Sequence, residues 1–298
     1  MHKLLGALIC LFLVACQQEP ASGPAQTAAP EPEAVAAVDA LGKALDAQTD
    51  EARARYAYRH PRETLEFFGV EPGMTVVEGL PGGGWYSRIL LPYLGSEGRL
   101  IGADYSMDMW PLFSFVTEEF LANQAGWVDN FPIDAEEWAG DAGASAAAFT
   151  FGAMPDEFKE SADVVLMIRA LHNLARFSGE ERDFLGEALA DAYAALKPGG
   201  ILGVVQHQAR EDMSDGFADG SNGYLKKSRV IAAAEQAGFV LVAESDINAN
   251  PKDQPTEQDI VWRLPPTLGT SAEDPELRAA LEAIGESNRM TLKFRKPE

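Results

Sequence analysis

Residues 74–87 read MTVVEGLPGGGWYS, and this stretch decides the fold. Its β-branched run ends in Glu78 and in a turn with three consecutive glycines, 82–84, and a helical pattern follows at 86–93. A strand, an acid, a glycine turn and a helix in this order predict a nucleotide-type pocket at the carboxyl end of a parallel strand. Glycines let backbone N–H groups approach a ligand closely, although a tight βα turn without a ligand has the same composition.

The rest of the chain continues the alternation of strands and helices. Strands are expected at 74–77, 99–103, 146–151, 162–168, 201–205, 239–243 and 290–294. Helices are expected at 38–56, 61–68, 86–93, 185–196, 228–237 and 275–284, with further helical turns within the aromatic-rich segment 107–121. The spacing of Ser178 and Glu181 indicates a capping box before one of these helices. The alternation predicts an α/β fold, a Rossmann-like three-layer sandwich around a mostly parallel sheet.

Composition excludes several classes of protein. The chain of 298 residues has a formal net charge of −22, which argues against a nucleic-acid partner, because lysine and arginine must neutralise phosphates. Its two cysteines both precede residue 17, so the body has neither a disulfide framework nor a cysteine-based metal site. The four histidines, His60 among them, have no regular spacing, so no metal site is predicted.

The amino terminus is set apart from the fold. Residues 1–16 look like a bacterial lipoprotein signal whose apolar run, too short for a stable span, stops at the lipidated Cys16. An ordinary secretory signal is the alternative. Residues 17–40, rich in Ala and Pro, are expected to be a disordered tether, and residues 41–298 a single domain with leading helices. Gln17 after the cysteine favours an outer-membrane anchor, with the protein facing the periplasm.

Asp104 ends the second expected strand, 20 residues beyond Gly84. In a βαβ unit this places a carboxylate at the tip of the neighbouring strand, where it can accept both hydroxyls of a ribose. The alternative is an aspartate that caps the next helix.

These motifs resemble the class I S-adenosylmethionine-dependent methyltransferases, and more closely the predicted methyltransferases found as bacterial lipoproteins. The resemblance covers about residues 55–298. It rests on VEGLPGGGWY at 77–86, Asp104, Arg169 with His172-Asn173, LKPGG at 196–200 and GESNRMTL at 285–292. It implies a seven-stranded sheet with an antiparallel last strand, S-adenosylmethionine as cofactor, and methyl transfer to a small-molecule or envelope acceptor.

The resemblance also implies roles for individual residues. Glu78 would face the amino group of the methionine moiety, and Asp104 would hold the ribose. Gly79, Gly82, Gly83 and Gly84 would line the cofactor, with backbone close to its carboxypropyl chain. The adenine side falls near Phe151-Gly152. Leu80 is a departure, because it stands where the superfamily pattern has its first glycine. A nicotinamide cofactor is disfavoured, because Ser87 occupies the place of the third dinucleotide glycine.

Further side chains are candidates for the acceptor side of the pocket. His172 and His207 follow the fourth and fifth strands and are the candidate catalytic bases, but His172 and Asn173 would equally well bond the loop backbone. Arg169 would pair with Asp104 or Glu78, or bind an anionic substrate. Trp85 and Tyr86 would wall the cofactor or belong to the core.

Three functions remain open from the sequence. The first is a membrane-tethered methyltransferase. The second is a non-catalytic envelope-anchored binding protein that retains the fold, because S-adenosylmethionine has no obvious source outside the cytoplasm. The third is an interaction protein in which the glycine loop is a bare turn.

Overall fold

The order of strands in the sheet determines where the functional edge lies. The computed structural model describes residues 39–140 and 143–298, whose eight-stranded sheet contains the path β3-β2-β1-β4-β5-β8-β7. The strands are β1 (Thr75–Gly79), β2 (Arg99–Asp104), β3 (Ser145–Thr150), β4 (Ala162–Ile168), β5 (Leu196–Ala209), β6 (Leu225–Lys226), β7 (Val240–Ser245) and β8 (Arg289–Arg295). Strands β3, β2, β1, β4 and β5 pair in parallel, whereas β8 is antiparallel to both β5 and β7. The predicted mostly parallel sheet with an antiparallel last strand is confirmed. The short β6, which pairs with β5, is additional.

The central strands are buried on both faces, as their apolar runs predict. Val76, Val77, Val165 and Leu166 are all buried. Because β8 runs against its neighbours, its amino end lies at the same edge as the carboxyl ends of β1, β2, β4 and β5. His207 pairs with Arg289 at that edge. Residues from five strands therefore converge there.

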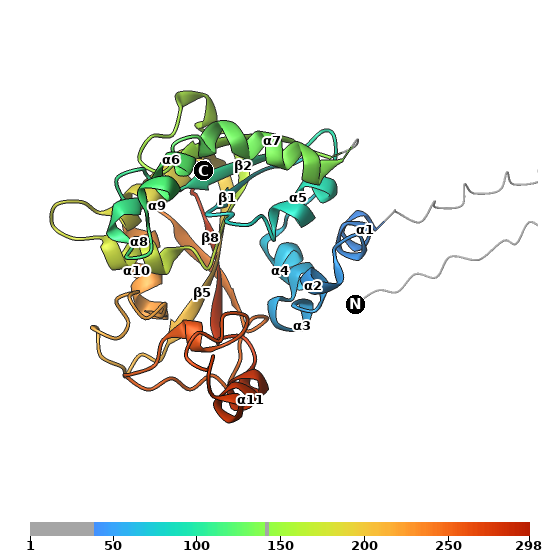
Figure 1. Cartoon of the computed structure of the whole chain (residues 1–298). Helices are drawn as coiled ribbons and strands as arrows, with labels where there is room; N and C mark the ends of the chain where they lie inside the picture. Colours follow the sequence, from blue (N-terminus) through green and yellow to red (C-terminus); the bar gives the residue numbers. More distant parts are fainter. Residues whose placement is uncertain (1–38, 141–142) are drawn as a thin grey trace, which may run out of the picture. The chain divides into compact units, whose positions relative to one another are not determined.

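Helices cover both faces of this sheet. One apolar cluster joins the strands to α1, α4, α5 and α7, and the other joins them to α8, α9 and α10. In Figure 1, α4 and α5 lie to the right of the sheet and α8 and α9 to the left. The helices are α1 (Ala40–Asp46), α2 (Asp50–Arg53), α3 (Tyr56–Arg59), α4 (Pro61–Phe68), α5 (Ser87–Leu94), α6 (Glu118–Gln124), α7 (Trp127–Ala139), α8 (Leu171–Phe177), α9 (Phe184–Ala195), α10 (Lys227–Gln236) and α11 (Pro275–Ile284), with 3₁₀ turns at Trp110–Leu112, Asp156–Phe158 and Val261–Arg263.

Two local predictions were wrong. The leading helix is divided into α1, α2 and α3, because Thr49 caps a new helix by accepting a hydrogen bond from Ala52 N–H. The capping box at Ser178 does not form, since α9 begins at Phe184 with Asp183 as its cap. Ser178 instead ends α8, and its hydroxyl donates to the Leu174 carbonyl.

The amino-terminal predictions fall largely outside the described residues. The signal at 1–16 with Cys16, and the tether up to residue 38, are not described. Asp39 caps α1 by accepting a hydrogen bond from Gly42 N–H. Within residues 39–140 and 143–298, no helix has both the length and the apolar character that a membrane span requires.

Candidate functional site

Two carboxylates lie at the tips of neighbouring strands. Glu78 pairs with Gly102 in the β1–β2 register, so Asp104 lies two residues further along β2 at the same edge. Glu78 is 5% exposed and Asp104 8% exposed. Neither carboxylate has an ion-pair partner within 4.0 Å among the residues that the structure describes. Such burial without a cation is costly unless a ligand supplies the missing partner.

Burial controls the protonation of both groups. It raises the pKa of Glu78 to about 7, although the Ser87 hydroxyl, which donates to Oε2 at 2.6 Å, and the charge of Arg169 act in the opposite direction. Burial also raises the pKa of Asp104 to about 7, against a smaller lowering by Tyr105 N–H. Each carboxyl group is thus part-protonated at neutral pH and able to ionise when a cation or hydroxyl donors arrive.

The glycine turn has an open part and a packed part. An added Cβ would meet nothing within 4 Å at Gly83, and at Gly82 only the Leu80 carbonyl at 4.0 Å. At Gly84, with φ +74°, it would lie 2.5 Å from the indole of Trp138 on α7. At Gly79 it would collide with the sulfur of Met167 on β4. Packing therefore explains Gly79 and Gly84, whereas Gly82 and Gly83 present free backbone.

Leu80 adopts a conformation that suits glycine. Its φ is 55°, in the left-handed region that costs an ordinary residue roughly 1–2 kcal/mol. Its N–H donates to the Ala103 carbonyl at 2.7 Å, which fastens the turn to β2. The turn thus keeps the backbone path of a glycine pattern despite the leucine.

Trp85 and Tyr86 face the amino-terminal helices. The Trp85 ring packs edge-on against Tyr56 at 5.9 Å between centroids, and the Arg59 guanidinium lies 4.5 Å above it. The buried Tyr86 hydroxyl donates to the Arg59 carbonyl at 3.4 Å. Both rings therefore connect the glycine turn to α3.

The two candidate bases lie side by side. The rings of His172 and His207 are 5.4 Å apart, edge to face. Burial lowers the pKa of His172 to about 4 and that of His207 well below its ordinary value, so both are neutral at pH 7. Gln206 donates from Nε2 to the Gly223 carbonyl, which leaves its Oε1 to accept a 3.4 Å hydrogen bond from His172 Nδ1. The Nε2 atom of His172 is then an acceptor. His207 Nδ1 contacts the Ser287 hydroxyl at 2.6 Å.

Two cavities lie near these histidines: His207 lines the first, and His172 packs 5.9 Å from Trp262, which lines both. One, of about 120 Å³, is lined by Arg169, His207, Trp262 and Ser287, among others. The other, of about 410 Å³, is largely aromatic, with Tyr105, Trp110, Phe113, Phe115 and Trp262 in its wall. Asn173 lines the second cavity and donates to the Tyr105 hydroxyl at 3.0 Å, rather than to loop backbone. Trp262 lines both cavities, so the arginine side and the aromatic side of the site meet at this residue.

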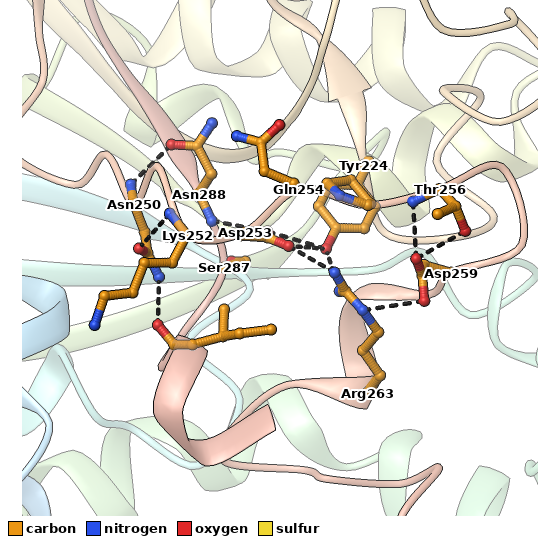
Figure 2. Close-up of polar contacts among 12 residues, drawn as sticks. Tyr224, Asn250, Lys252, Asp253, Gln254, Thr256, Asp259, Arg263, Ser287 and Asn288 are labelled. Atoms are coloured by element: carbon orange, nitrogen blue, oxygen red, sulfur yellow. Dashed lines mark hydrogen bonds and ion pairs between the residues drawn. The ribbon is translucent and has the colours of Figure 1, made fainter. Parts of the chain in front are cut away.

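A buried polar network holds the segment before β8 in place. Asp253 accepts hydrogen bonds from Arg263 Nη2 at 2.8 Å and from Asn288 N–H at 2.9 Å. The Tyr224 hydroxyl accepts from Arg263 and donates to Asp253, so it bridges these two residues. Asn250 donates to the Glu286 carbonyl at 2.6 Å. Figure 2 shows Asp253 and Asn250 bonded to Asn288, the residue that follows Ser287. The network therefore positions Ser287 against His207.

Several site residues were not predicted from the sequence. Ser87 was considered only as a missing glycine, yet it donates to Glu78. Arg59 and Trp262 come from a short helix and a long connection that carried no motif. Glu286 and Ser287 lay within the GESNRMTL stretch that carried the resemblance, and that stretch was the available signal.

Arg169 pairs with neither carboxylate. No ion pair within 4.0 Å joins it to Glu78 or Asp104, and its Nε is buried without a hydrogen-bond partner among the described residues. Its φ of 59° turns the chain at the end of β4. Across residues 39–140 and 143–298, no group of three or more His, Cys, Asp or Glu side chains could hold a metal ion.

No protein-family model matches the chain, and no curated protein matches it. Among solved structures, an S-adenosylmethionine-dependent methyltransferase from Aquifex aeolicus is 14% identical with a TM-score of 0.48, over 86% of this chain and 98% of that one. The [4+2]-cyclase SpnF is 16% identical, with a TM-score of 0.47 over 81% of each chain. The 1,6-didemethyltoxoflavin-N1-methyltransferase of Burkholderia thailandensis, solved with 1,6-didemethyltoxoflavin and S-adenosylhomocysteine, is 13% identical, with a TM-score of 0.43 over 84% of this chain and 82% of that one. At these identities and TM-scores the reaction and the substrate must be inferred from the chain's own residues.

Proposed function

We propose that the protein is an S-adenosylmethionine-dependent methyltransferase that acts on a small-molecule or envelope acceptor. The observation that carries the proposal is the pair of buried carboxylates, Glu78 and Asp104, that flank an open glycine turn without a cation partner in the described residues. S-adenosylmethionine offers the complementary groups, an ammonium and two ribose hydroxyls.

The residues present fit this cofactor. Glu78 would hold the ammonium, and Ser87 keeps its carboxylate oriented by a 2.6 Å hydrogen bond. Asp104 would accept both ribose hydroxyls. Gly82 and Gly83 have room for close approach, because neither would place a Cβ against other atoms closer than 4.0 Å. A dinucleotide fits less well, since the third glycine of its fingerprint is replaced by Ser87, whose hydroxyl is engaged by Glu78.

Methyl transfer requires little catalytic chemistry from the protein's side chains. S-adenosylmethionine supplies a methyl group already activated on a sulfonium. The protein orients the acceptor in line with that methyl group and excludes water. The aromatic cavity around Trp110 and Trp262 suits the body of an organic acceptor. His172 packs against Trp262 of this cavity, and His207 lines the neighbouring cavity of about 120 Å³. Burial lowers the pKa of both rings, so they are neutral and weak bases that suit hydrogen bonding to an acceptor hydroxyl or amine, and an acceptor that needs no base fits best.

The proposal includes the location expected from the sequence. Lipidation at Cys16 would anchor the protein in the outer membrane, facing the periplasm, and this rests on residues 1–17 alone. A non-catalytic binding protein would share the pocket and the anchor but would transfer no methyl group.

Two experiments test the proposal in sequence. The purified chain is first titrated with S-adenosylmethionine, with NAD as the comparison ligand, and saturable binding of the former alone is expected. The protein is then incubated with methyl-labelled cofactor and a fractionated envelope extract, and label should pass to an extract component. Absence of cofactor binding at millimolar concentration refutes the proposal. Binding without any transfer across all fractions supports the binding protein instead.

A further inference from the structure

Four arginines gather where α3 packs against the segment before β8. Three of them surround one carboxylate: the distances to Glu286 are 2.6 Å from Arg55 Nη2, 3.4 Å from Arg59 Nε and 3.2 Å from Arg289 Nη2. Arg169, at the end of β4, is the fourth member of this arginine cluster. Arg169 and Glu286 line the same cavity of about 120 Å³, and Glu286 in turn contacts Arg59.

The charges of the arginine cluster do not balance. Arg59 is 2% exposed and Arg289 3% exposed. Glu286 is the one carboxylate that forms ion pairs with the cluster in the part of the chain that the structure describes. Burial, and then the charge of Arg169, lower the pKa of Arg59 to about 9, and burial followed by Arg289 lowers that of Arg169 to about 10. An excess of buried positive charge destabilises the folded protein unless an anion compensates it.

Two buried donors in the cluster are unused. Arg59 Nη1 and Arg169 Nε have no hydrogen-bond partner among the described residues. A purely structural role, in which Glu286 fastens α3 to β8, explains Arg55, Arg59 and Arg289 but leaves Arg169 without a function. Arg169 also lines the cavity of about 120 Å³, which has room for a small oxyanion, given that one water occupies roughly 10–15 Å³ by this measure.

We propose that the cavity lined by Arg169 is an oxyanion-binding subsite that takes a carboxylate or phosphate group beside the site of methyl transfer, with the positive charge of Arg59 behind Glu286 adding to the attraction. Guanidinium groups suit both anions, because their planar donors match two oxygens at once. Arg169 follows β4, the neighbour of the strand that carries Glu78, and shares its cavity with Trp262 of the aromatic wall. The subsite therefore adjoins the proposed sites of both the cofactor and the acceptor.

The oxyanion has two candidate sources, and the assignment between them rests on the proposed function. One is the carboxylate of the cofactor's methionine moiety, and the other is an acidic group of the acceptor. Competition between phosphate and cofactor analogues distinguishes the two sources. If phosphate displaces S-adenosylhomocysteine but not 5′-methylthioadenosine, which lacks the carboxylate, the subsite serves the cofactor. If phosphate and S-adenosylhomocysteine bind together, it serves an acidic acceptor.

The subsite itself is tested without any cofactor, so its failure is distinct from failure of the proposed function. Phosphate is titrated into the full chain and followed by ³¹P NMR, with Arg278→Gln, an exposed arginine on α11, as the control. Arg169→Gln should weaken phosphate binding at least about tenfold, as expected for a lost charge-assisted hydrogen bond. Arg169→Lys should weaken it less, because the charge remains.

Glu286→Gln provides a change in the opposite direction. It removes the competing carboxylate, so phosphate should bind several-fold more tightly, an outcome that misfolding cannot imitate. Thermal unfolding establishes which variants are folded. The proposal is overturned if folded wild-type protein binds no phosphate, or if wild type, Arg169→Gln and Arg278→Gln bind it equally.

Discussion

Replacing Asp104 with asparagine should stabilise the ligand-free protein and abolish the proposed ribose contact. Burial raises the pKa of this carboxyl from 3.8 to about 7. About three pKa units at 1.36 kcal/mol each correspond to roughly 4 kcal/mol of unfolding free energy that the ionised carboxylate takes away at pH 8. Asparagine has nearly the same shape and no charge, so Asp104→Asn should recover much of this amount.

The pH dependence identifies the cause. The Asp104 carboxyl binds its proton more tightly in the folded protein than in the unfolded chain. Ionisation of Asp104 therefore lowers the unfolding free energy as pH rises from about 4 to about 7. The same pKa values predict a penalty of only about 1.5 kcal/mol at pH 5. The advantage of Asp104→Asn should therefore grow by about 2.5 kcal/mol between pH 5 and pH 8. This difference is free of the amide's own packing contribution.

Urea denaturation at both pH values measures the effect, and Asp134→Asn, at an exposed position on α7, is the matched control. The same Asp104→Asn protein should lose most affinity for S-adenosylhomocysteine. A stability gain combined with a loss of binding cannot come from misfolding. If Asp104→Asn changes stability by the same amount at pH 5 and pH 8, the carboxylate is not buried as described, and the reasoning fails.

Three further substitutions probe the glycine turn and its neighbour. Gly84→Ala should lower the unfolding free energy by about 2 kcal/mol or more, because its Cβ would meet Trp138 at a positive φ, as measured by urea denaturation. Gly83→Ala should leave stability within about 0.5 kcal/mol but weaken S-adenosylhomocysteine binding about tenfold in calorimetry, and unchanged affinity would remove Gly83 from the site. Ser87→Ala should cost about 1–2 kcal/mol at pH 8 and less at pH 5, where Glu78 is protonated, and a pH-independent cost would contradict the role of its hydroxyl.

Sequence patterns predicted the sheet well, because its signals are local. The apolar run at 162–168 forms β4 with the expected bounds, and Asp104 ends β2 as predicted. The sequence pattern failed to predict where α9 begins, because two possible capping residues lie close together. Ser178 and Glu181 have the spacing of a capping box, yet α9 begins later, and Asp183 caps it by accepting a hydrogen bond from Gly186 N–H.

The candidate site was predictable only in part. Glu78 and the open glycines lie within one short motif, and Asp104 follows Gly84 after 20 residues, so their spacing was visible in the sequence. The arginine cluster was not, because Arg59 and Glu286 are separated by 227 residues and meet only in the folded chain. The role of Gly84 likewise depends on Trp138, which comes from a helix that the sequence did not define.

Calorimetric titration of S-adenosylhomocysteine at pH 6.5 and pH 8.0, in buffers of different ionisation enthalpy, tests the central claim most directly. With both carboxyl groups titrating near pH 7, the ligand should bind at both pH values and more tightly at pH 8.0. At pH 6.5 it should release protons as Glu78 and Asp104 ionise against it. No binding at millimolar ligand, or binding without proton release at pH 6.5, would contradict a cofactor site built on these two buried carboxylates.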